Sequence, residues 1–77
     1  MFEACLRDKR GDIKDTDYAE TREDAARLIF ARHPKAESVQ TCRAYVNETL
    51  GVWRGNGYDL QWTSRDFIRL CDLLGNA

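Results

Sequence analysis

Six carboxylate side chains are concentrated between residues 12 and 24 of this 77-residue chain. Only Lys14 and Arg22 oppose them there, so the segment carries a net charge of −4 although the whole chain carries −1. Carboxylates on a surface attract a basic groove in the way that phosphate groups do. We therefore expect a partner-binding surface made of Asp12, Asp15, Asp17, Glu20, Glu23 and Asp24. The alternative is a solvated surface of mixed sign.

A second candidate surface combines an aromatic ring with two guanidinium groups, from Arg43, Trp53 and Arg54. Aromatic and arginine side chains on a sheet stack on unpaired bases, and Tyr58 and Trp62 would extend such a surface. A sequence pI near 5.7 and the lack of an RNP-type motif weigh against this use. We therefore expect a protein partner, and direct binding of nucleic acid is the alternative.

The sequence contains no recognisable catalytic signature. It lacks a G-x-S-x-G elbow, an H-E-x-x-H motif and a phosphate-binding glycine loop. Cys5, Cys42 and Cys71 form no C-x-x-C pair, and the single histidine, His33, precedes Pro34 at an expected helix end. These spacings suit neither a disulfide framework nor a zinc site. We expect no enzyme, no catalytic residue, no metal ion and no cofactor.

The N-terminal part of the chain is predicted to form a hairpin. Residues 2–7 alternate between apolar and polar side chains, as in a strand with one buried face. Gly11 tolerates the positive φ that a turn requires, and residues 12–20 would return as a second strand.

Two helices are predicted by one short pattern. Thr21 is followed three residues later by Asp24, and Thr63 by Asp66, which is the spacing of a capping box. The repeat could record a duplicated ββα unit, but helix initiation explains it without duplication. The first helix would run from about Arg22 to His33 and the second from residue 64 to about Gly75. Their buried faces would contain Ala25, Ala26 and Ile29 in the first and Phe67, Ile68, Leu70, Cys71 and Leu74 in the second.

Three strands are expected between the helices, at residues 39–46, 50–54 and 58–62. We interpret them as a meander, with Gly55-Asn56-Gly57 as the last hairpin turn. Tyr58, Leu60 and Trp62 would share one face of the final strand. Trp53 would lie either beneath the second helix or exposed to solvent.

Together these elements predict an α+β fold and one domain, residues 1–77. The expected architecture is a small antiparallel sheet of four to five strands, in the order ββαβββα, with two helices packed on it. Hydrophobic residues make up 43% of the chain and charged residues 32%, which favours a folded domain over disorder. No apolar run approaches the roughly 20 residues of a membrane span. We expect a cytoplasmic protein.

Several segments resemble the small phage-encoded anti-CRISPR proteins: a strand close to Met1, a hairpin leading into ETREDAARLIFAR, the step LGVWR, and YDLQW. The resemblance covers roughly residues 1–63, and TSRDFIRLCDLLGNA extends beyond the shorter members. It implies a non-enzymatic, stoichiometric inhibitor that binds a CRISPR surveillance complex, with type I favoured, and blocks target DNA engagement in a bacterial host. No functional residue can be transferred, because those proteins share no common site.

Two alternatives remain. The chain could instead be a small nucleic-acid-binding or regulatory module of a phage or mobile element. It could also form a homodimer, in which Leu73 and an exposed Trp53 would contribute to a self-complementary surface.

Overall fold

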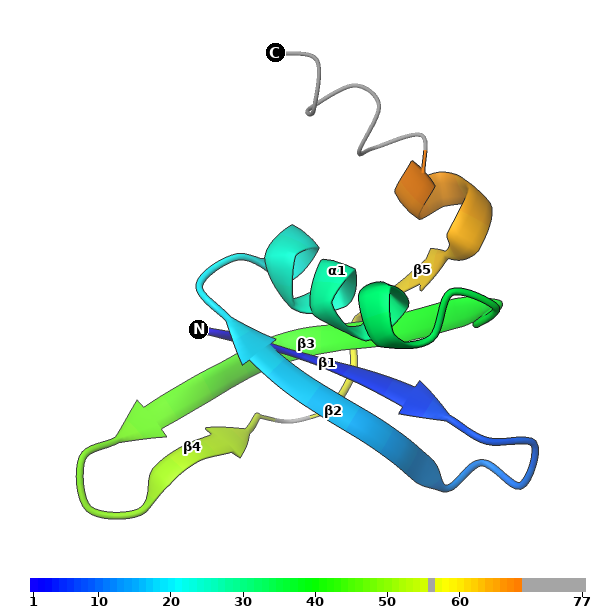
Figure 1. Ribbon diagram of the computed structural model, residues 1–77. Helices are drawn as coiled ribbons and strands as arrows, with labels where there is room; N and C mark the ends of the chain where they lie inside the picture. The colour runs from blue at the N-terminus through cyan, green and yellow to red at the C-terminus, as the bar shows by residue number, and fades with distance from the viewer. Residues whose placement is uncertain (56, 69–77) are drawn as a thin grey trace, which may run out of the picture.

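The computed structural model describes residues 1–55 and 57–68 and shows an antiparallel sheet with helices packed on it (Figure 1). In the described residues the order is ββαβββα, which confirms the predicted α+β fold. A second helix occupies residues 64–68 and follows directly after the last strand. The other elements are β1 (Phe2–Arg7), β2 (Ile13–Ala19), α1 (Arg22–Arg32), β3 (Ser38–Asn47), β4 (Gly51–Arg54) and β5 (Leu60–Thr63).

The sheet has β1 and β3 at its centre. β1 pairs with β2 on one side and with β3 on the other, and both pairings are antiparallel. β4 pairs with the end of β3, at residues 44–47, and β5 pairs with its beginning, at residues 38–41. β4 and β5 therefore run in the same direction along one side of β3.

This arrangement corrects the predicted meander. A hairpin turn would reverse the chain, but β4 and β5 are both antiparallel to β3 and so point the same way. The Gly55 N–H donates to the Arg43 carbonyl at 3.2 Å, and the Asp59 N–H donates to the Thr41 carbonyl at 3.0 Å. The chain leaves the β3 ladder after Gly55 and rejoins it at Asp59. Gly57, which has a φ of 107°, and Tyr58 lie off this edge of the sheet, between the two hydrogen bonds.

Helix α1 covers one face of the sheet. Its residues Ala25, Ala26 and Ile29 are fully buried, as predicted from their spacing. They pack in one cluster with Val39 of β3 and with small and aliphatic side chains of β1. The small side chains of Ala25 and Ala26 let the helix approach the sheet closely, and Ile29 fills the space that remains between helix and sheet.

The second helix is joined to the same core by aromatic contacts. The rings of Phe30 and Phe67 are stacked with centroids 4.7 Å apart, and Trp62 meets Phe67 edge-on at 6.2 Å. Phe67 is buried, as predicted, whereas Ile68 is 60% exposed, so its predicted burial is wrong. Leu70, Cys71, Leu73 and Leu74 lie outside the described residues.

The threonine half of each predicted capping box is confirmed. The Asp24 N–H donates to Thr21 Oγ1 at 3.1 Å, and the Asp66 N–H donates to Thr63 Oγ1 at the same distance. Each threonine satisfies one of the free amides of a first helical turn. The repeated threonine therefore has a structural role at both places.

Strand β1 is buried on both faces, which corrects the expectation of one exposed face. Ala4 and Leu6 face α1, while Glu3 and Cys5, on the other side, are also buried. The cause is the position of β1 in the middle of the sheet and the placement of Tyr58 against Glu3. The alternation of apolar and polar residues in β1 cannot show that Tyr58, which is distant in the sequence, covers the second face of the strand.

Candidate functional site

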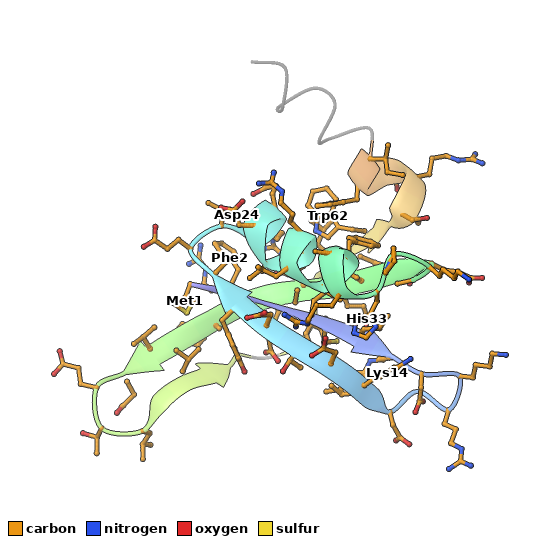
Figure 2. The ribbon with its side chains drawn as sticks, in the orientation of Figure 1. Met1, Phe2, Lys14, Asp24, His33 and Trp62 are labelled. Carbon is orange, nitrogen blue, oxygen red and sulfur yellow. The ribbon has the colours of Figure 1, made fainter. Side chains whose placement is uncertain are left out.

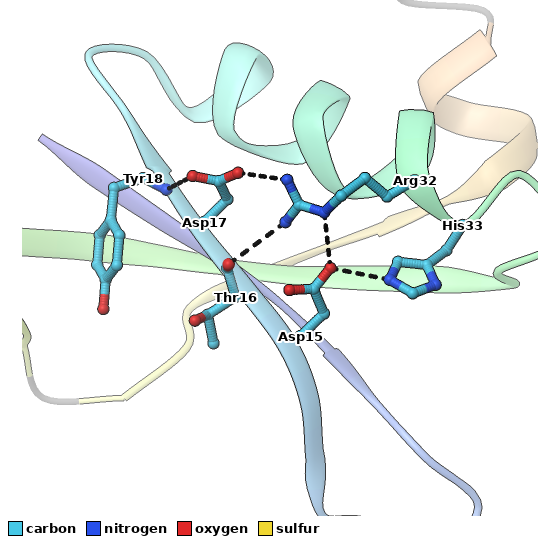
Figure 3. Close-up of polar contacts among 6 residues, drawn as sticks. All are labelled: Asp15, Thr16, Asp17, Tyr18, Arg32 and His33. Carbon is cyan, nitrogen blue, oxygen red and sulfur yellow. Dashed lines mark hydrogen bonds and ion pairs between the residues drawn. The ribbon is translucent and has the colours of Figure 1, made fainter.

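The structure places two of the six predicted acidic residues in an ion-pair cluster around Arg32 (Figure 3). Arg32 Nε donates to Asp15 Oδ2 at 2.9 Å, and its Nη1 donates to Asp17 Oδ2 at 2.6 Å. A third donor, Nη2, reaches the Thr16 carbonyl at 3.4 Å. His33 Nε2 lies 2.8 Å from Asp15 Oδ2. The end of α1 is thereby fixed to β2.

Alternation along β2 explains this cluster. Asp15 and Asp17 pair with Leu6 and Ala4 of β1, so all four side chains face α1. The hydrogen bond from Arg32 is the main cause that lowers the pKa of both carboxyl groups. Hydrogen bonding to Asp15 and then to Asp17 is the main cause that raises the pKa of Arg32. Within the described chain these two acids have an internal partner, which weakens their attraction for an external basic groove.

The other four predicted acids lie in two separate places. Asp12 is exposed in the turn before β2, whereas Glu20, Glu23 and Asp24 surround the start of α1. Asp24 pairs with Arg27 at 3.1 Å. In Figure 2, Lys14 lies at the start of β2, next to the β1–β2 turn, and Asp24 lies beyond the other end of β2, at the start of α1. The structure thus divides the six acids between the turn before β2, β2 itself and the start of α1, and does not gather them into one surface.

The alternative surface is only partly within the described residues. Arg43 is exposed on β3, and its guanidinium lies 5.9 Å from the ring centroid of Phe2. The side chains of Trp53 and Arg54 lie outside the described part of the chain. Trp62 is half-buried against Phe67 and does not join an exposed stacking surface.

Tyr58 does not share a face with Leu60 and Trp62, contrary to prediction, because β5 begins only at Leu60. Its ring instead reaches the face of the sheet opposite α1, where its hydroxyl donates to Glu3 Oε1 at 3.0 Å. Cys42 Sγ donates to Glu3 Oε2 at 3.7 Å. Burial is the largest cause of a raised pKa at Tyr58, and hydrogen bonding with the Cys5 thiol is the next.

A further surface, which the sequence pattern did not reveal, lies on the β3–β4 hairpin. Val46 is 60% exposed and Leu50 is 78% exposed. Val46 pairs across the hairpin with Val52, which is half-buried. We call Val46, Leu50 and Val52 the hairpin surface. Apolar residues stand on both sides of Asn47-Glu48-Thr49 in the sequence. A strand pattern alone cannot show that both described helices lie elsewhere and leave these residues exposed.

Comparison of the sequence with protein-family models finds no match, and searches for similar curated proteins and similar solved structures find none either. The helices within residues 1–55 and 57–68 do not combine the length and the apolar composition that a membrane-spanning helix requires.

Proposed function

We propose that the chain is a non-enzymatic, stoichiometric inhibitor that binds a CRISPR surveillance complex, with type I favoured, and blocks engagement of target DNA. The class of target comes from the sequence resemblance. The protein-binding part of the proposal rests on one structural observation, the exposed hairpin surface.

The hairpin surface extends beyond the part of the sheet that is covered. β1 pairs with β3 only at residues 40–43, so beyond Ala44 the hairpin has two strands, and no helix of the described residues lies above it (Figure 1). Exposed apolar side chains that gather on a small protein commonly mark a site of protein contact. A hairpin of two strands is marginally stable alone, so a partner that buries Val46 and Leu50 would also order it.

The acids at the start of α1 support a secondary role in this proposal. Glu20 is exposed and has no ion pair within the described residues. Exposed charges change the rate of association more than the final affinity. Glu20, Glu23 and Asp24 would steer the protein towards a basic surface on the partner. The hairpin surface would supply the buried contact.

The proposal is tested with the double variant Val46→Ser/Leu50→Ser. Wild type is expected to prevent a purified type I surveillance complex from binding target DNA, and the variant should require at least about tenfold more protein, since removal of buried apolar side chains costs several kcal/mol at an interface. Ile13→Ser is the matched control, because Ile13 is 41% exposed on β2, away from the hairpin. Circular dichroism must show that both variants are folded.

Two results would contradict the proposal. If the wild-type protein neither binds nor inhibits the complex, the proposed CRISPR target is wrong. Equal inhibition by wild type and the hairpin variant would show that the hairpin surface is not the contact.

A further inference from the structure

A hollow opens where β4 and β5 separate along the edge of β3. Its volume is about 430 Å³, within the range of roughly 300–1,000 Å³ that small-molecule sites occupy. The break in the edge creates it, because the chain leaves the β3 ladder after Gly55 and returns at Asp59. It is lined by Arg22, Arg43, Tyr45, Gly57, Tyr58 and Asp59.

Two guanidinium groups line the hollow. Those of Arg22 and Arg43 lie 5.0 Å and 5.9 Å from the ring centroid of Phe2, so both make a cation–π contact with the same ring. Arg22 is further fixed by Thr41 Oγ1 at 3.1 Å and by Asp59 Oδ1 at 2.5 Å. Arg43 forms no ion pair with a carboxylate in the described part of the chain. One cation is therefore available to an anionic ligand next to a second that is held in place.

The same hollow presents an aromatic ring. Tyr45 is 51% exposed, and its ring packs closely over Gly55, where an added Cβ would lie 2.9 Å from Tyr45 Cε2. The absence of a side chain at Gly55 thus lets the backbone support one side of this ring. A ring that is supported on one side and open to solvent elsewhere is a suitable surface for stacking a planar group.

We propose that this hollow binds a nucleotide, with its phosphate between Arg43 and Arg22 and its base against Tyr45. Guanidinium groups match the geometry of phosphate oxygens, and a half-exposed ring accepts any base. An acidic peptide would use the two arginines but has no group for the ring. This site is independent of the proposed inhibitor function, because Val46 and Leu50 do not line it.

Asp59 is the internal competitor for the phosphate. Its hydrogen bond with Arg22 is the main cause that lowers its pKa, and the charge of Arg43 contributes to the same effect. Because its side chain is 62% exposed, it can move away from Arg22 at little cost. Replacing Asp59 with Asn should therefore strengthen nucleotide binding.

The test is titration of the full chain with adenosine 5′-monophosphate at low salt, followed by calorimetry or by NMR shifts. Wild type is expected to bind. Arg43→Gln should weaken the affinity at least about tenfold, because it removes a charge-assisted hydrogen bond to the phosphate, and Asp59→Asn should strengthen it about threefold, because it releases Arg22 for the phosphate. Arg65→Gln is the matched control, because Arg65 is exposed on the second helix and does not line the hollow. Val46→Ser/Leu50→Ser should bind the nucleotide as wild type does.

Adenosine tests the contact with the Tyr45 ring alone, and inorganic phosphate tests the contact with the two arginines alone. Each should bind more weakly than the nucleotide. A short single-stranded oligonucleotide distinguishes a nucleotide within a strand from a free nucleotide, and Arg43→Gln should weaken whichever binds more tightly. No binding at about 5 mM nucleotide would overturn the proposal. So would an equal decrease in affinity for Arg43→Gln and Arg65→Gln, or inorganic phosphate binding as tightly as the nucleotide.

Discussion

The hydroxyl of Tyr58 donates a hydrogen bond to the carboxylate of Glu3, with 3.0 Å between the two oxygens. The bond joins residues 55 positions apart, and Glu3 is only 3% exposed. A buried carboxylate must have hydrogen-bond donors, because desolvation without them is costly. Tyr58 supplies one donor. This bond also holds the segment before β5 against the face of β1 that α1 does not cover.

Tyr58→Phe is expected to lower the free energy of unfolding by about 1–3 kcal/mol, since it leaves a buried acceptor without its donor. Tyr45→Phe is the control, because Tyr45 is half exposed and water can replace any bond of its hydroxyl. Urea unfolding at pH 7 measures both. Equal effects of the two substitutions would show that the bond to Glu3 contributes nothing specific.

Arg32→Gln should lower stability at pH 7 and much less in acid. Asp15 and Asp17 have lowered pKa values in the folded protein, mainly through Arg32. Their contribution is therefore complete above the ordinary aspartate pKa of about 3.9 and is lost as the pH falls through the folded values. The difference in melting temperature between wild type and variant should shrink below about pH 4.

Arg27→Gln provides the comparison for that experiment. Arg27 pairs only with Asp24 in the described structure, and both side chains are more than half exposed, so its substitution should have little effect at any pH. A difference between wild type and Arg32→Gln that stays constant from pH 7 to pH 3 would contradict an ionic origin.

Thr63→Ala should cost about 1 kcal/mol of stability, as removal of a helix cap usually does. Thr63→Ser retains the hydroxyl that accepts from the Asp66 N–H and should recover most of that stability. Thermal unfolding of the two variants tests this directly. If serine and alanine are equally destabilising, the hydroxyl is not the stabilising group.

Local rules predicted much of the fold. Alternation located β1, the turn at Gly11 indicated the returning strand β2, and helix periodicity located the buried residues Ala25, Ala26 and Ile29. Capping chemistry identified both helix starts, because a Thr side chain and an amide three residues later interact within one turn. These features depend on residues close together in the sequence.

The features that were missed depend on distant residues. The turn chemistry of Gly55 and Gly57 indicated a hairpin, but pairing of β5 with β3 decided the direction of the chain. The acidic residues were identified, yet only the packing of α1 on β2 places Arg32 against Asp15. Likewise, the burial of Glu3 requires Tyr58 to reach back to the first strand.

Titration of a purified type I surveillance complex with this protein, before target DNA is added, measures the proposed inhibition itself. We expect saturable binding at a fixed molar ratio, and a complex that no longer binds target DNA once that ratio is reached. Val46→Ser/Leu50→Ser should fail to reach saturation at the same concentration. A complex that binds target DNA with unchanged affinity in the presence of excess folded wild-type protein would contradict the proposed inhibition.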